Sequence, residues 1–174
     1  AISTVSGGSA TENGTQSVTI TITENESAPT VTLATSATSI AENAGSSLTL
    51  TATLSVATTA DVTVGISTSG TGTEGTDYST ISDITISAGA TTGTASFTPT
   101  DDSVYEGNET GIVAISTVSG GSATEDGTQS VTITITENES SPTVTLATSA
   151  TSIAENAGSS LTLTATSSIV ADED

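Results

Sequence analysis

Apolar and polar residues alternate in short runs along most of the chain, and no stretch shows the helical period of about 3.6 residues. Between residues 29 and 141 these runs predict seven β-strands, separated by clusters of Gly, Ser, Asn and Asp. The predicted strands lie at 31–33 with a continuation near Ile40, and at 48–54, 62–66, 84–86, 95–97, within 110–118, and at 131–136. Seven short strands in roughly 110 residues are typical of an immunoglobulin-like antiparallel β-sandwich. We therefore predict an all-β fold.

The same pattern recurs along the chain. Residues 1–53 reappear as 114–166 with only two differences, since Asn13 becomes Asp126 and Ala28 becomes Ser141. A period of 113 residues is too long for a solenoid coil and suits a small β-domain. We expect residues 29–141 to form one complete repeat, with the last two strands of a preceding repeat at 1–28 and the first strands of a following repeat at 142–174. The chain starts at Ala1 and is cut within repeats, so we expect a window on a longer secreted polypeptide. The alternative, that separate chains complete each other's partial repeats, stays open.

The path of the predicted strands decides where the loops lie. In an up-and-down order, the loops after the first, third and fifth strands and the end of the seventh strand share one pole. An odd number of strands also makes the chain enter at one pole and leave at the other, so successive repeats should run end to end as a tandem array. Nine acidic residues of the complete repeat fall at the shared pole: Glu42, Glu74, Asp77, Asp101, Asp102, Glu106, Glu109, Glu137 and Glu139.

Charge makes this pole unusual. The chain has 20 acidic residues and no Lys, Arg or His, for a formal net charge of −20. Such a chain should not bind nucleic-acid backbones, and no apolar run approaches the roughly 18 residues of a membrane span. Residues 101–109 alone contain four carboxylates, and hard divalent cations such as Ca²⁺ take about six to eight oxygen ligands. We interpret this loop as the centre of a calcium site. The alternative is that the loops are acidic only because they are exposed.

Four motifs in a fixed order resemble the Calx-β domain, a family that includes calcium-sensing domains of sodium/calcium exchangers and long tandem arrays in bacterial surface proteins. The motifs are SIAENAG at 39–45, GTDY at 75–78, DD with EGNE at 101–109, and VTITI followed by ENE at 131–139. The resemblance implies that the acids before the second strand, in the loop 101–109 and after the last strand hold Ca²⁺. Together with the acidic loop, it gives eight candidate ligands: Glu42, Asp77, Asp101, Asp102, Glu106, Glu109, Glu137 and Glu139.

Three places depart from the family pattern. Ser69 and Gly70 offer no carboxylate early in the loop after the third strand. Asn138 and Asn108 stand where calcium-rich members often carry an acid. Fewer charged ligands usually weaken calcium binding, so we expect weak sites suited to millimolar extracellular calcium.

The function that follows is structural. We expect a calcium-stabilised repeat of a secreted or cell-surface stalk or extracellular filament, whose partners are neighbouring copies of the same repeat. We expect no enzyme, because without His, Cys, Lys or Arg only a carboxylate pair could act, and no insertion is present to form a cleft. Two alternatives stay open: an adhesin module that binds a receptor or glycan through its loops, and an ice-binding face formed by outward Thr rows such as Thr132, Thr134 and Thr136.

Overall fold

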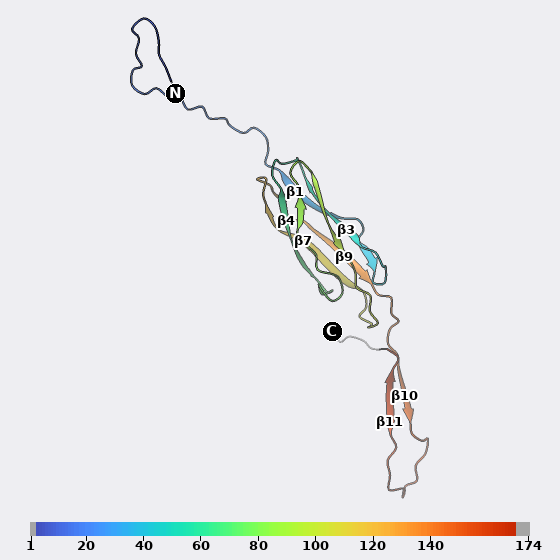
Figure 1. Ribbon diagram of the computed structural model, residues 1–174. Helices are drawn as coiled ribbons and strands as arrows, with labels where there is room; N and C mark the ends of the chain where they lie inside the picture. The colour runs from blue at the N-terminus through green and yellow to red at the C-terminus, as the bar shows by residue number, and fades with distance from the viewer. Residues whose placement is uncertain (1–2, 170–174) are drawn as a thin grey trace.

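A computed structural model describes residues 3–169 and contains β-strands and no helix in this range. The strands between residues 30 and 136 form a two-layered sandwich (Figure 1). Residues 3–29 extend from one end of this sandwich, and a separate hairpin continues from the other end. Among the described residues, no helix could cross a membrane.

Two sheets make up the sandwich. The first has the order β6-β3-β1-β8, and the second has the order β2-β9-β7-β4-β5. The strands of the first sheet are β6 (Thr92–Phe97), β3 (Leu48–Leu54), β1 (Thr30–Thr35) and β8 (Thr124–Glu125). Those of the second are β2 (Ser39–Ala41), β9 (Ser130–Thr136), β7 (Glu109–Ser119), β4 (Val62–Gly70) and β5 (Ile84–Ile86).

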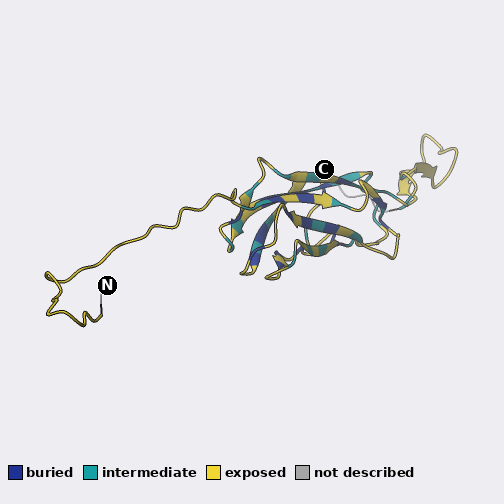
Figure 2. Cartoon of the chain, turned by 90° about the horizontal axis from the view of Figure 1, so that it is seen from above, coloured by how far each residue is buried: buried dark blue, intermediate teal, exposed yellow. Residues whose placement is uncertain are grey.

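The core lies between the sheets and follows the two-residue period of the strands. In β3, Leu50, Ala52 and Leu54 are buried and Thr49 and Thr53 are exposed, as the alternating bands in Figure 2 show. Burying one such aliphatic side chain stabilises the fold by about 1.5–3 kcal/mol. The alternation of apolar and polar residues therefore favours a strand, and burial of its apolar side chains supplies much of the stability.

An aromatic pair closes the core beneath the acidic pole. The rings of Tyr78 and Phe97 are stacked with centroids 4.6 Å apart, and both residues are almost completely buried. Gly111 of β7 lies directly against this pair, because a Cβ atom there would be 2.7 Å from a carbon of the Phe97 ring. The glycine thus makes room for the aromatic layer on which the loops rest.

The seven strands predicted between residues 29 and 141 all appear in the structure, whereas the two expected in residues 1–28 are absent from the described part of that segment. The prediction of a wholly antiparallel sandwich also needs two corrections. The first predicted strand is split: β1 lies in one sheet and β2 crosses to the other, where it pairs in parallel with β9. The sequence analysis also missed β8, which pairs in parallel with β1. Both parallel pairs involve strands at sheet edges, where a short segment can bond to whichever neighbour has free backbone groups.

The two partial repeats differ from each other. The hairpin of β10 (Val144–Thr148) and β11 (Leu163–Ser167) keeps the register of β1 and β3, shifted by 113 residues. Its apolar side chains are uncovered, since Val144 and Leu146 are each 71% exposed. Residues 3–29 contain no strand, although their sequence is that of residues 116–142 with two substitutions. The two strands of a hairpin form their backbone hydrogen bonds with each other. The strands expected in 1–28 would form theirs with other strands of a sheet, and this segment lacks those strands. The division into repeats stays a prediction.

Candidate metal centre

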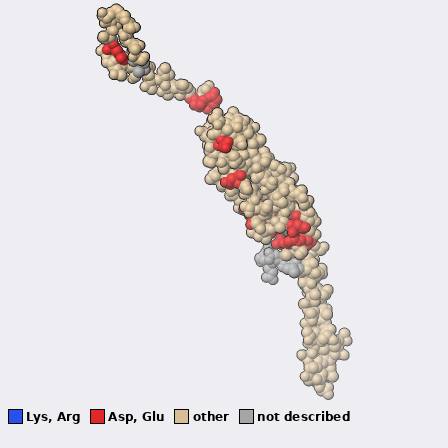
Figure 3. Space-filling view, in the orientation of Figure 1, with Lys and Arg blue, Asp and Glu red and all other residues tan. Residues whose placement is uncertain are grey.

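Figure 3 shows the largest group of acidic side chains at the end of the sandwich from which the chain leads to the hairpin, with smaller groups elsewhere along the chain. Glu42 directly follows β2, and Asp77 lies in the connection between β4 and β5. The loop 101–109 joins β6 to β7, and Glu137 and Glu139 follow β9. These connections share one pole, as the strand parity predicts. Oxygen atoms from four separate parts of the chain are thereby brought together.

The first cluster consists of Glu42, Glu137 and Glu139, whose nearest carboxylate oxygens all lie within 4.8 Å of one another. Glu42 is only 6% exposed, and its Oε1 accepts a hydrogen bond from the backbone N–H of Asp102 at 3.2 Å. Burial, with repulsion from Glu137 and Glu139, raises the pKa of Glu42 to about 7. The buried acid therefore gains from any cation that enters this cluster.

Glu137 has the opposite environment, because backbone N–H groups surround its carboxylate. Its Oε2 accepts from Glu106 at 2.7 Å and from Gly107 at 2.8 Å, and its Oε1 accepts from Asn138 and Glu139 at 2.9 Å each. Burial acts to raise its pKa, but the backbone and side-chain hydrogen bonds together lower the pKa of Glu137 to about 2. Glu137 thus stays ionised and fixes the loop 101–109 against the end of β9.

Glu139 carries an oxygen without a partner. Its Oε1 accepts from the Asn138 amide at 2.8 Å, whereas its Oε2 is buried with no hydrogen-bond donor among the described residues. The neighbouring carboxylate of Glu137, and then burial, raise the pKa of Glu139. Buried polar atoms are rarely left unsatisfied in folded proteins, so this oxygen is the clearest local sign that the cluster suits a cation.

The second cluster consists of Asp77, Glu106 and Glu109, again with one oxygen from each within 4.8 Å of the others. Burial, with repulsion from Asp77 and Glu106, raises the pKa of Glu109 to about 7. The backbone positions Asp77 firmly, because its N–H donates to the Thr73 carbonyl at 2.9 Å and its carbonyl accepts from Thr100 at 2.9 Å. Two groups of mutually repelling carboxylates therefore lie side by side at one pole.

Six of the eight predicted ligands belong to the two clusters, and Asp101 and Asp102 do not. Both are exposed. Asp102 has structural contacts instead, since its backbone N–H donates to Glu42 and its Oδ1 accepts from Val104 N–H at 2.7 Å. Glu74, also at this pole, accepts from Thr68 Oγ1 and Ile81 N–H and so holds its own loop.

The donor set fits a hard divalent cation. Both clusters offer only carboxylate oxygens, which Ca²⁺ prefers, and the chain contains neither the thiolates nor the imidazoles of typical zinc sites. Three side-chain oxygens per cluster leave several of the six to eight calcium ligands to carbonyl groups and water. The residues present therefore fit calcium.

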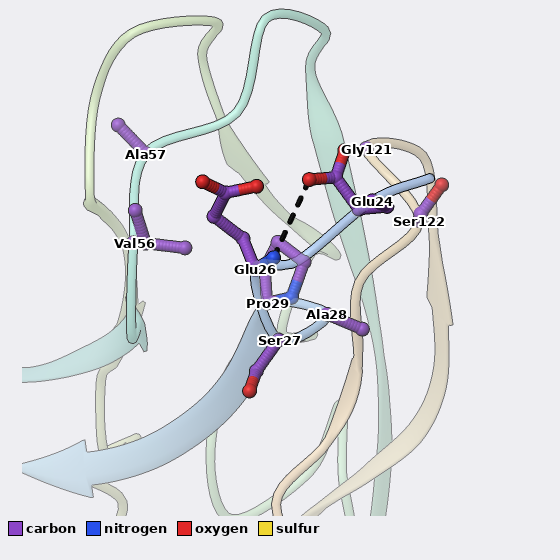
Figure 4. Close-up of a pocket in the computed structure, with 9 residues that line it drawn as sticks. All are labelled: Glu24, Glu26, Ser27, Ala28, Pro29, Val56, Ala57, Gly121 and Ser122. Carbon is purple, nitrogen blue, oxygen red and sulfur yellow. Dashed lines mark hydrogen bonds between the residues drawn. The ribbon is translucent and has the colours of Figure 1, made fainter. Parts of the chain in front are cut away.

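A pocket lies at the pole of the sandwich opposite the two carboxylate clusters. Its walls come from the segment that enters β1 and from two loops: Glu24, Glu26, Ser27, Ala28, Pro29, Val56, Ala57, Gly121 and Ser122 (Figure 4). Glu24 occupies the repeat position of Glu137, and its Oε1 accepts from Asn25 and Glu26 N–H as Glu137 accepts from Asn138 and Glu139. The Glu-Asn-Glu turn therefore forms locally, without the loop that completes the metal centre.

Comparisons with known proteins agree with this architecture. No curated protein matches the chain in sequence. The crystal structure of the apo form of the Calx CBD1 domain is similar with a TM-score of 0.51 at 16% identity, over 64% of this chain and 99% of that one. The crystal structure of CBD12 from CALX1.2 aligns with a TM-score of 0.49 at 18% identity, over 56% of this chain and 40% of that one. A family model described as the Calx-beta domain matches residues 24–139, which is more than half of the chain. The chain therefore belongs to the Calx-beta domain family.

Proposed function

We propose that this chain is a calcium-stabilised structural module of a secreted or cell-surface stalk or filament. Calx-beta domains are calcium-binding modules of larger proteins. The observation that carries the proposal is the pair of carboxylate clusters at one pole of a chain without a single basic side chain. Since no Lys or Arg can neutralise them, a bound cation is the remaining source of compensating charge.

Each residue of the pole has a distinct part in this proposal. Glu42, Glu137 and Glu139 would hold one ion, and Asp77, Glu106 and Glu109 a second. A bound ion would supply positive charge to buried carboxylates and a partner for Glu139 Oε2. The backbone N–H groups of Glu106 and Gly107 keep Glu137 in place before any ion arrives.

The setting and the partners are part of the same proposal. Weak carboxylate sites suit the millimolar calcium outside cells, and neighbouring copies of the same repeat would be the partners. The metal centre lies at the pole from which the chain continues to its next segment, so a bound ion there would stiffen the joint. We propose neither a catalytic role nor contact with nucleic acid or the membrane interior. The adhesive alternative has less support, because the pocket at the other pole is lined by small side chains and two acids rather than aromatic or basic anchors.

Calcium should therefore raise the melting temperature of the chain. A ligand at about a hundredfold excess over its Kd adds about 2.7 kcal/mol to the free energy of unfolding. Melting curves in chelator and in millimolar calcium measure the effect, and terbium luminescence sensitised by Tyr78 and Tyr105 reports ion binding at this pole. Glu106→Gln and Glu137→Gln should reduce the shift. Glu155→Gln is the matched control, because Glu155 is the repeat equivalent of Glu42 in the exposed hairpin segment. Identical melting temperatures in chelator and calcium would refute the proposal.

The stalk requires a second measurement. A protein with several consecutive repeats should be rod-like in calcium and more flexible in chelator, which small-angle scattering detects as a change in maximum dimension. An unchanged dimension, together with a normal thermal shift, would keep calcium binding and reject the stiffening role.

A further inference from the structure

The loop 12–16 contains the chain's one Asn-Gly pair, Asn13 and Gly14. Both residues are exposed, and Gly14 has a φ of +73° with nothing within 4 Å of the position that a Cβ would take. The backbone nitrogen of a residue that follows Asn can attack the side-chain amide, and a glycine offers no side chain to obstruct that approach. The chain's five other asparagines precede Glu or Ala: Asn25, Asn43, Asn108, Asn138 and Asn156.

The second copy of this loop shows what the position tolerates. At the repeat equivalent of Asn13 the chain carries Asp126, again followed by a glycine with positive φ, Gly127 at +67°. The hydrogen bonds of the two loops also correspond. Gln16 N–H donates to Glu12 Oε1 and the Gln16 amide to the Asn13 carbonyl, as Gln129 does to Glu125 and Asp126. An aspartate therefore fits the conformation that Asn13 now occupies.

The two loops differ in what holds them. Asp126 N–H donates to the Val31 carbonyl at 3.0 Å, and Thr124 N–H to the Pro29 carbonyl at 3.0 Å, because β8 pairs with β1. In the loop 12–16, by contrast, the bonds described are the two local ones of Gln16. In the described part of this chain, where no strand like β1 pairs with the loop 12–16, the backbone around Asn13 can move more easily into the geometry that ring closure needs.

We propose that Asn13 is a site of spontaneous deamidation. The Gly14 nitrogen, after losing its proton to solvent base, bonds to Cγ of Asn13. The Cγ–Nδ2 bond breaks, ammonia leaves, and a succinimide remains. Water then opens the ring at either carbonyl, giving an aspartate or an isoaspartate at position 13. The aspartate reproduces the loop at Asp126, whereas the isoaspartate lengthens the backbone and displaces Gln16 from its bonds to Glu12 and Asn13.

The full chain is incubated in mildly alkaline buffer, and released ammonia is measured alongside intact mass and fragmentation spectra. We expect one equivalent of ammonia, with the amide-to-acid mass change confined to position 13. Gly14→Ala should slow the conversion several-fold, and Gly127→Ala, the matched control, should leave it unchanged. Asp126→Asn places a second Asn-Gly pair in the tethered loop, where conversion should be slower than at Asn13.

Each outcome decides a part of the proposal. Retention of the Asn13 amide while other asparagines convert, or an equal rate in Gly14→Ala, overturns the site. Equal rates at position 13 and at position 126 of the Asp126→Asn variant overturn the protection that we assign to the tethers of β8. Isoaspartate without mass change would show isomerisation of an existing aspartate such as Asp126 instead, and would also count against Asn13.

Discussion

Without calcium, the chain should lose stability as the pH rises from about 4.5 to about 7. The pKa of Glu42 and that of Glu109 are each raised from 4.5 to about 7 in the folded state. Between these values the folded chain holds protons that the unfolded chain has released, so the free energy of unfolding falls as pH increases. The stabilising protonated forms are fully present below pH 4.5 and are lost as the pH passes the folded values.

The size of the effect follows from burial. Each pKa unit corresponds to about 1.4 kcal/mol, so Glu42, which is 6% exposed, contributes a change of about 3 kcal/mol over the interval. Glu109 is partly exposed and solvent screens its charge, so we expect it to change the free energy of unfolding by about half as much as Glu42 does. Glu137 acts in the other direction, because its pKa of about 2 adds stability above pH 4.5 that disappears as the pH falls towards 2. The apo chain should therefore be most stable near pH 4.5.

Urea unfolding at pH 4.5 and pH 7, in chelator and in millimolar calcium, tests this directly. Calcium should remove most of the decline, because an ion replaces the protons on Glu42 and Glu109. The general repulsion of a chain with charge −20 would also lower stability at pH 7, so a variant must separate the two causes. Glu42→Gln should flatten the apo profile, and Glu155→Gln, at the exposed repeat equivalent, should not. A profile that declines equally in wild type and Glu42→Gln would refute the assignment to Glu42.

Three further substitutions test the parts of the fold that support the centre. Glu137→Gln removes the ionised acceptor of four backbone N–H groups and should destabilise the apo chain by about 2–3 kcal/mol in urea unfolding, since hydrogen bonds to charged groups are the strong ones. Gly111→Ala should destabilise it by about 1–3 kcal/mol, because the new methyl overlaps the Phe97 ring; an unchanged urea midpoint would disprove this packing. Leu50→Ala should cost about 2–5 kcal/mol, whereas Leu163→Ala, the repeat equivalent that is 67% exposed, should change the unfolding midpoint little.

The sequence predicted the strands well where one face of a strand is buried. The alternation of Leu48–Leu54 identified β3 with its correct ends, because every second side chain enters the core. The same reasoning could not find β8, whose two residues have no pattern of their own and are strands only because the edge of β1 is free. The sequence pattern also could not show that β2 lies in a different sheet from β1. An interrupted strand has the same pattern of apolar and polar residues whichever sheet its second part joins.

The gathering of acidic loops at one pole was predictable from the sequence, whereas which carboxylates lie close together there was not. Strand parity placed the acidic loops together, and this required only the order of the strands. Which carboxylates meet is decided by backbone N–H groups, and these have no signature in side-chain composition. In the loop 101–109, the N–H groups of Asp102, Glu106 and Gly107 point to Glu42 and Glu137, and Asp101 and Asp102 are left exposed.

In a chain without basic side chains, backbone N–H groups can stabilise a carboxylate, and this pole uses them for Glu137. Under the proposed function, bound ions would stabilise the other acids. Glu137 takes four N–H groups and is ionised at every physiological pH, so it can shape the loop in the absence of calcium. Glu42 takes one N–H from Asp102 and is buried, and Glu139 keeps one oxygen without a donor among the described residues. The pole is therefore shaped without an ion, and near neutral pH a bound cation would relieve the repulsion that protonation of Glu42 and Glu109 relieves in acid. Under the proposed function, the binding of calcium would therefore require little further ordering of the loop, and its free energy would appear as stability at the joint where the chain leaves the domain.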